Sequence, residues 1–177
     1  ICIIDMRLDK FTTKAQEALQ DAHGISAERG QQQVDVLHLL KALLLQEDSL
    51  VLAIVDKFGA DVKKIDKEID SALTRLPRLN VVVGGGMMQA YLTQDLGRLI
   101  EQSFREAEKM KDEFVSTEHF LLAMLSGPNK AKEVLELWLE ELLEQGKNIP
   151  KNKFQPIISE VKINISAKKN NYEAVNS

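Results

Sequence analysis

The sequence predicts an all-α fold that contains two copies of one helical unit, followed by an irregular C-terminal tail. Apolar residues recur at the three- and four-residue spacing of amphipathic helices, first from Thr12 onward and again from Thr93 onward. The segment VDVLHLLKALL, residues 34–44, also matches VSTEHFLLAML, residues 115–125, as V-[DS]-x-x-H-[LF]-L-x-A-[LM]-L. His38 and His119 lie 81 residues apart, as do Thr12 and Thr93, so the duplication includes the helix before each histidine.

The first helix of the first copy should begin near Thr13 and end near Gly30. Thr13, followed three residues later by Gln16, has the form of a capping box, in which two side chains satisfy backbone N–H groups at a helix start. The apolar face of this helix is expected to consist of Ala15, Ala18, Leu19, Ala22 and Ile25.

Three further helices complete the first copy, which we place at residues 12–74. Asp35 can cap a helix that runs through Gln46. Ser49 can open a third helix that Gly59 ends in the left-handed conformation, and Asp61 can open a fourth. The fourth helix carries the apolar stripe Val62, Ile65, Ile69 and Leu73.

Residues 75–92 are predicted to link the two copies. Pro77 stops the helical pattern, and the glycines 84–86 impose no conformation of their own. The β-branched run 81–83 could pair as a short strand, but a loop is favoured because the glycines follow it directly.

The second copy, residues 93–145, should repeat the helical order of the first. Thr93 can cap its first helix, and Ser116 can cap the helix that carries the second histidine. A Gly-Pro pair at 127–128 should end that helix before another begins near Asn129. The apolar face of the first of these helices is expected to consist of Leu96, Leu99, Ile100, Phe104, Ala107 and Met110.

Composition narrows the function classes. A chain of 177 residues with 44% hydrophobic content can bury a core, and a net charge of −4 with a pI near 5.5 disfavours nucleic acid as a partner. Cys2 is the only cysteine, which suits a reducing compartment, so we expect a cytoplasmic protein. No apolar run is long enough for a signal-peptide core or a membrane span. Residues 1–5, before Met6, are treated as an extension without a role.

No pattern in the sequence indicates catalysis, a metal or a cofactor in this chain. His38 and His119 each lie just inside a helix start among leucines, with no second histidine or cysteine at ligand spacing. A structural role at the helix start is therefore favoured over a catalytic or metal-binding one. A small helical enzyme that uses Glu118 with His119 stays as an alternative, although adjacent helical residues do not share a face.

The seam between the two copies is the expected binding surface. If one amphipathic helix from each copy packs against its twin, the seam forms a groove edged by helix starts and the linker. Asp112, Glu113 and Glu118 form an acidic cluster at the helix junction of the second copy. Their positions alone leave open whether this cluster is the rim of a binding groove or a solvated turn and helix cap.

Five segments of the chain, in the right order and spacing, resemble the Clp amino-terminal repeat domain. They are MRLDKFTTKAQEAL at 6–19, VLHLLKALL at 36–44, ALTRLP at 72–77, TQDLGRLIEQS at 93–103 and FVSTEHFLLAML at 114–125. The opening MRLDKFT is most similar to ClpB-type disaggregase chaperones. The resemblance covers about residues 6–137 and implies a domain, residues 6–145, of two four-helix repeats related by a pseudo-twofold axis.

The resemblance implies a substrate-recruiting domain, itself without enzymatic activity, of a ClpB-type AAA+ chaperone that acts in protein disaggregation and the stress response. Its implied partners are unfolded or aggregated proteins, with adaptor or chaperone proteins as further partners, and neither nucleic acid nor membrane. ATP and magnesium belong to ATPase modules missing from this chain, so the isolated chain should be a monomer although full-length members are hexameric. The alternative within the family is the adaptor-binding domain of a protease-partner Clp ATPase.

The substrate-contacting positions of the family fall here on Thr12 at the first helix cap and on Asp112 and Glu118 around the helix junction of the second copy, each of which matches in residue type. The resemblance therefore favours a binding role for the acidic cluster.

Two features depart from the family pattern. The linker is longer by a few residues, and LWLE at 137–140 replaces the usual Leu-Phe-Gly break, so the helix can continue to about Gln145. Residues 146–177 match nothing in the family, and we expect this tail to be poorly ordered. A fragment, a frame-shifted reading or a natural stand-alone variant would each give such a sequence.

Overall fold

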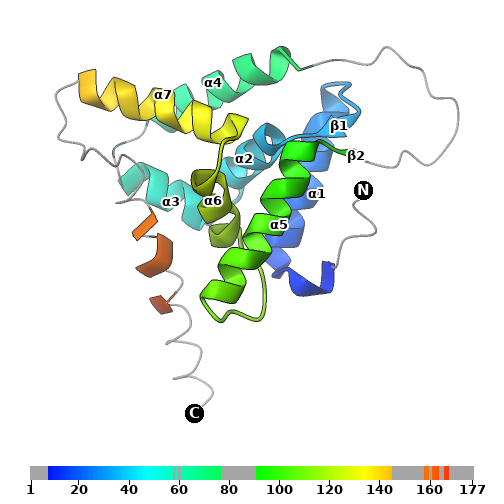
Figure 1. Ribbon diagram of the computed structural model, residues 1–177. Coiled ribbons are helices and arrows are strands. Elements are labelled where there is room, and N and C mark those ends of the chain that lie inside the picture. The colour runs from blue at the N-terminus through cyan, green and yellow to red at the C-terminus, as the bar shows by residue number, and fades with distance from the viewer. Residues whose placement is uncertain are drawn as a thin grey trace, which may run out of the picture.

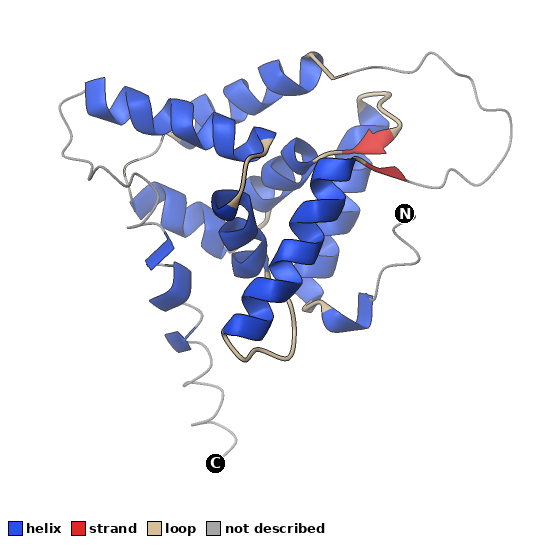
Figure 2. Ribbon diagram, viewed as in Figure 1, coloured by secondary structure: helices blue, strands red, loops and turns tan. Residues whose placement is uncertain are grey.

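The computed structural model describes residues 8–57, 59, 61–76, 91–144, 158–159, 161–163 and 166–167. Within these residues the fold is all-α, as predicted, with one pair of very short strands (Figures 1 and 2). A short 3₁₀ helix, Leu8–Lys10, is the first element of the described residues. The named elements that follow are α1 Thr13–Glu28, β1 Gln33–Val34, α2 Val36–Leu45, α3 Leu50–Lys57, α4 Val62–Thr74, β2 Tyr91–Leu92, α5 Gln94–Lys109, α6 Thr117–Ser126 and α7 Lys130–Glu144.

The cap of α1 is Thr12, so the predicted capping box of Thr13 with Gln16 was wrong by one residue. The Thr12 hydroxyl accepts a hydrogen bond from the backbone N–H of Ala15 at 3.2 Å. Gln16 turns back instead, and its Nε2 donates to the carbonyl of Leu8 at 2.7 Å. Thr12 becomes the cap because its backbone is extended, with φ −63° and ψ 160°, before the helix begins.

The other predicted helix starts are confirmed. Each begins after a residue whose side chain or backbone accepts from the first helical turn, which satisfies donors that have no partner within the helix. These residues are Asp35, Ser49, Asp61, Thr93, Ser116 and Asn129. Gly59 follows α3 with φ 79°, the left-handed conformation predicted for it.

The two copies are joined by two short parallel backbone pairings. Val34 of β1 pairs in parallel with Leu92 of β2, and Phe11 pairs in parallel with Val115. The shift of 81 residues converts the first pair into the second, since Val34 corresponds to Val115 and Phe11 to Leu92. The start of each copy's first helix is thus tied to the start of the other copy's second helix, as a pseudo-twofold axis requires.

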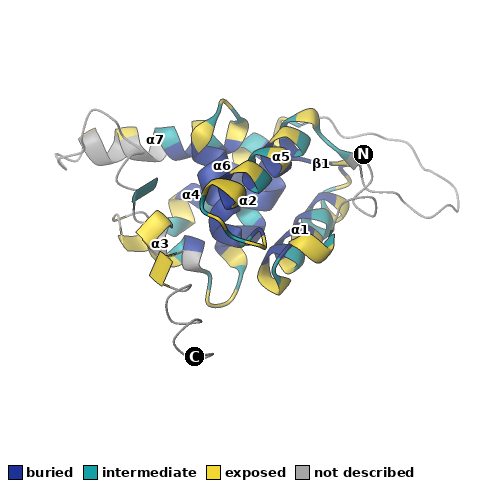
Figure 3. Ribbon diagram, turned by 60° about the horizontal axis from the view of Figure 1, so that its bottom comes forward, coloured by how far each residue is buried: buried dark blue, intermediate teal, exposed yellow. Residues whose placement is uncertain are grey.

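Helices α2 and α6 form the centre of the core (Figure 3). Every residue from Thr117 to Leu125 is buried, so α6 is enclosed on all sides. The sequence suggested that equivalent helices would pack against each other. The main contacts between the copies instead join helices that are not equivalent, because α4 packs on α7, α2 packs on α5 and α7, and α6 packs on α1 and α3.

Two predicted regions lie largely outside the described residues. Pro77, the suggested strand at 81–83 and most of the linker fall there, although β2 at its end shows a pairing that the sequence did not predict. Helix α7 continues to Glu144, as predicted from LWLE. In the tail, Val161 is buried and Ile158 packs against the core, and the order of the rest of residues 146–177 stays a prediction.

Candidate functional site

The histidine of the first copy completes a helix start inside the core. His38 Nδ1 accepts from the backbone N–H of Asp35 at 2.9 Å, and its Nε2 lies 2.7 Å from Oε1 of Gln31. Because a backbone N–H can only donate, Nε2 carries the ring proton and donates to Gln31. Burial lowers the pKa of His38 to about 4; the Asp35 carboxylate opposes this shift, and the positive charge of Arg29 adds to it. His38 is therefore neutral at pH 7, in agreement with a structural role.

The histidine of the second copy makes the same cap but has a carboxylate as its other partner. His119 Nδ1 accepts from the backbone N–H of Ser116 at 2.9 Å. Its Nε2 lies 2.9 Å from Oδ2 of Asp112, whose side chain is 15% exposed while that of His119 is buried. A buried imidazole thus holds a carboxylate in place at the edge of the solvent.

Identical helix ends bring Gln31 and Asp112 to the two histidines. Gly30 and Lys111 follow α1 and α5 with φ values of 66° and 58°, and Gln31 and Asp112 come directly after them. Gln31 donates its backbone N–H to the carbonyl of Ser26, and Asp112 donates its own to the carbonyl of Ala107, each five positions earlier and at 2.9 Å, as in a Schellman motif. These two partners of the histidines were not predicted from the sequence, although the shift of 81 residues pairs Gln31 with Asp112.

The start of α1 adjoins the loop that carries Asp112. The backbone N–H of Thr12 donates to the carbonyl of Val115 at 2.9 Å. The ring of Phe11 packs between Phe104 and Phe120, with centroid separations of 5.2 and 5.8 Å. The structure therefore places Thr12 beside the α5–α6 loop, and we call this region, Thr12 with residues 112–118, the Thr12–Asp112 junction.

The three predicted site residues differ in exposure. Thr12 and Asp112 are partly exposed, and Glu113 and Phe114 beside them are exposed. Glu118, in the first turn of α6, is only 1% exposed. A partner can reach the carboxylate of Glu118 only if the atoms that cover it move.

The same geometry bears on the enzyme alternative. Both ring nitrogens of His119 already have partners, Ser116 and Asp112, and Glu118 is buried. Neither nitrogen is placed to exchange a proton with a substrate. Among the described residues, no group of three or more His, Cys, Asp or Glu side chains is arranged to hold a metal ion. In the same part of the chain, no helix combines the length and apolar character needed to cross a bilayer.

Residues 10–137 match the family model of the Clp repeat (R) N-terminal domain. The chain belongs to this family. The match begins just before Thr12 and ends within α7. The Clp repeat model therefore includes the Thr12–Asp112 junction and the two histidine boxes, a name we give to the capped helix starts formed by Asp35 with His38 and by Ser116 with His119.

Curated relatives of this Clp repeat chain include ClpB chaperones. The chaperone protein ClpB of Rhodopirellula baltica is 37% identical over 131 residues, which is 74% of this chain and 14% of that protein. The ClpB protein of Bacillus cereus is 36% identical over 120 residues, 67% of this chain and 14% of that protein. The chain thus spans about 14% of the length of these relatives.

Solved structures share the Clp repeat fold. The Hsp104 N-terminal domain from Candida albicans aligns with a TM-score of 0.62 at 18% identity, over 84% of this chain and 89% of that one. A ClpV N-domain in complex with a VipB peptide aligns with a TM-score of 0.61 at 20% identity, over 86% of this chain and 89% of that one. At these identities the likeness concerns the fold alone.

Proposed function

We propose that this chain is the substrate-recruiting N-terminal domain of a ClpB-type AAA+ disaggregase and binds unfolded or aggregated polypeptides. The observation that carries the proposal is the 37% identity to a ClpB chaperone over 131 residues. In this proposal, the threading of polypeptides, the hexameric ring and the use of ATP and magnesium belong to other modules of a cytoplasmic parent protein. The chain described here binds without catalysing a reaction.

The Thr12–Asp112 junction is the proposed contact surface. It combines an exposed aromatic ring, Phe114, with partly exposed hydrogen-bonding groups on Thr12 and Asp112. Exposed apolar side chains of a non-native polypeptide can pack against the ring, while the polar groups bind its unpaired backbone amides. Glu118 contributes beneath this surface, and its contact with a bound chain requires the covering atoms to shift.

A second candidate is the recruitment of a specific adaptor protein. It is supported by the ClpV N-domain, a protein of the same fold whose solved complex contains a VipB peptide. Such a partner would present one defined segment, whereas a disaggregase domain must accept many.

Binding of the full chain to a fluorescently labelled, reduced and carboxymethylated protein, which cannot refold, tests the proposal by fluorescence anisotropy. The native, disulfide-bonded form of the same protein serves as the folded probe. We expect binding of the unfolded probe only, and an affinity loss of about threefold or more for Thr12→Val and for Asp112→Asn, as for single contacts at the edge of an interface. Glu118→Gln tests whether the buried carboxylate takes part.

The internal repeat supplies a matched control. Thr93→Val removes the equivalent helix cap in the second copy, where Thr93 caps α5 as Thr12 caps α1. Thr93→Val also removes the hydrogen bond from the Thr93 hydroxyl to Oδ1 of Asp35 at 2.7 Å, so it should cost at least as much stability as Thr12→Val. An affinity loss confined to Thr12→Val would therefore support direct contact at the junction. Equal affinities for the unfolded and folded probes would contradict the disaggregase proposal and leave the adaptor alternative.

A further inference from the structure

Helices α4 and α7 enclose a cavity of about 230 Å³ that lies away from the Thr12–Asp112 junction. Figure 1 shows the two helices together at the top of the view, whereas the α5–α6 loop lies at the bottom. The cavity is lined by Lys64, Ile65, Glu68, Val134, Leu137, Glu140 and Glu144. It therefore forms a surface separate from the one proposed above.

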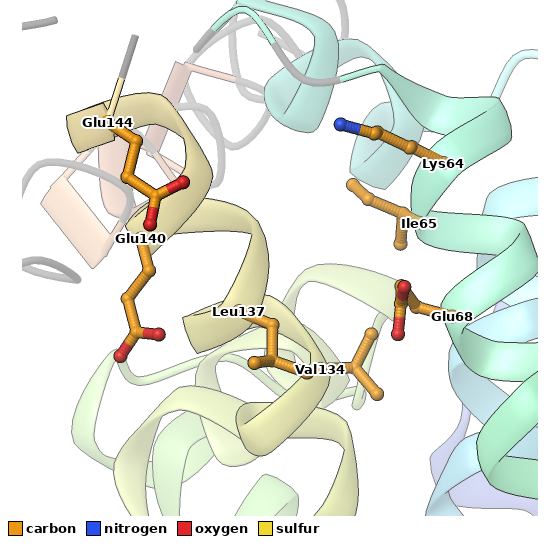
Figure 4. A pocket seen from close by; sticks show the side chains of 7 residues that line it. All are labelled: Lys64, Ile65, Glu68, Val134, Leu137, Glu140 and Glu144. Atoms are coloured by element: carbon orange, nitrogen blue, oxygen red, sulfur yellow. The ribbon is translucent and has the colours of Figure 1, made fainter. Parts of the chain in front are cut away.

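The cavity has an apolar floor and a mostly acidic rim. Ile65 and Val134 are buried at its base, while Leu137 is 51% exposed at its side. In Figure 4 Ile65 and Glu68 of α4 face Val134 and Leu137 of α7, while Lys64 extends toward the end of α7 that carries Glu144. Of the described residues that line it, three are carboxylates and one is an ammonium, and carboxylates come from both helices.

The acidic wall on α7 exists because this helix is longer than its counterpart. The shift of 81 residues aligns α3 with residues 131–138, so the last turns of α7 continue where the first copy ends α3 and begins α4. Gly59, which ends the first copy's helix in the left-handed conformation, corresponds to Glu140 within the continuing helix. The continuous helix that carries Glu140 and Glu144 beside α4 is therefore specific to the second copy, where these residues replace Gly59 and Lys63.

We propose that this cavity binds a short segment of another polypeptide in which lysine or arginine lies beside leucine-sized apolar side chains. An apolar side chain of the partner would cover Leu137 and reach Ile65 and Val134, which removes apolar surface from water. The carboxylates of Glu68 and Glu144, on opposite helices, would attract basic side chains and repel acidic segments. This inference does not depend on the function proposed for the Thr12–Asp112 junction.

The test measures anisotropy of a fluorescein-labelled peptide of alternating leucine and arginine with the full chain, beside a matched peptide of leucine and glutamate. We expect the arginine peptide alone to bind, and more weakly as salt is added. The double variant Glu68→Gln/Glu144→Gln should weaken binding about threefold to tenfold, the range for partly screened charge pairs. Leu137→Asn should weaken it by a similar factor.

A second double variant, Glu101→Gln/Glu133→Gln, removes the same charge from exposed positions that do not line the cavity. It should leave the affinity unchanged, and all substituted residues are exposed, so circular dichroism should report the native helicity. Binding that is indifferent to Glu68, Glu144 and Leu137, or equal for the two peptides, would overturn the proposal.

A final variant tests whether the chain's own lysines act as the ligand. Lys147, Lys151 and Lys153 follow α7 in the sequence. If Lys147→Gln/Lys151→Gln/Lys153→Gln raised the affinity for the arginine peptide about tenfold or more, the cavity would belong to the tail and the proposal of a separate partner would fail. An unchanged affinity would support it.

Discussion

The two histidine boxes use the same backbone but place a different group against the ring. In the first copy Gln31 is 5% exposed, and its amide also donates to the carbonyl of Leu73 on α4 at 2.7 Å. In the second copy Asp112 replaces it, and its carboxylate is partly exposed. One duplicated helix end thus completes a buried contact in one copy and holds an acidic group at the surface in the other.

The difference follows from what covers each box. Helix α4 lies over the first, where Arg29 pairs with Asp70 at 3.1 Å and Gln31 reaches Leu73. A carboxylate without a cationic partner would be costly in that position, whereas a neutral amide can both donate and accept. The second box lies next to the start of α1 and an exposed loop, where water can solvate Asp112. The copy that can tolerate a charge is the one predicted to bind a partner.

The largest expected effect comes from removing the first ring. His38→Leu leaves the backbone N–H of Asp35 and Oε1 of Gln31 without their partner in the core, at about 1–3 kcal/mol for each. We expect the free energy of unfolding, measured by urea denaturation at pH 7, to fall by about 4 kcal/mol. A loss below about 1 kcal/mol would show that the box is not structural.

His119→Leu provides the matched measurement in the second copy. It removes the partner of the Ser116 N–H, but Asp112 is already 15% exposed on its side chain and can be rehydrated. We expect a smaller loss, about 2 kcal/mol. Equal losses from the two substitutions would contradict the view that only the first box is closed to water.

The next effect is a dependence of stability on pH that originates in the first box. The pKa of His38 is lowered from 6.5 to about 4 in the folded chain, mainly because the ring is buried. Between these pH values the unfolded chain binds a proton that the folded chain does not. The contribution of the neutral His38 ring to the free energy of unfolding is therefore complete above about pH 6.5 and is lost as the pH falls toward 4. The loss from this residue is on the order of 3 kcal/mol.

Proton NMR of the histidine rings measures this directly. The ring signal of His38 should keep its neutral chemical shift at pH 5 and titrate with a midpoint near 4. In Gln31→Asp a carboxylate would replace the amide 2.7 Å from Nε2 and raise the pKa of His38, which shifts the midpoint upward. A midpoint near 6.5 in the unmodified chain would mean that the ring is open to solvent.

Sequence patterns predicted the helix starts well because caps are local chemistry. Asp35, Thr93 and Ser116 needed no knowledge of the rest of the molecule. The capping-box pattern placed the first cap at Thr13, one residue late, because the backbone of Thr12 is held extended by a hydrogen bond to Val115 in the other copy. A two-residue strand such as β2 has too few residues to show a period.

The candidate site was less predictable. The burial of Glu118 could not be predicted from the sequence. A charged residue usually marks the exposed face of an amphipathic helix, but α6 is enclosed on all sides and has no exposed face. The partner of each histidine lies seven residues before it, just after the end of the preceding helix. Only the internal repeat, which aligns these two partners, could have indicated them from the sequence. The assignment of Thr12, Asp112 and Glu118 to substrate contact stays a prediction.

The smallest expected change in the free energy of unfolding concerns the helix ends that present Gln31 and Asp112. This change should have opposite signs in the two copies. Gly30 has φ 66° and open space around a built Cβ, so Gly30→Ala should cost about 1 kcal/mol through backbone conformation alone. Lys111 adopts φ 58° with a side chain, and Lys111→Gly should gain about 0.5 kcal/mol, because strain relief exceeds the added freedom of the unfolded chain. Urea denaturation of both variants decides the matter. Changes of the same sign would mean that the two helix ends, despite matching hydrogen bonds, are not energetically equivalent.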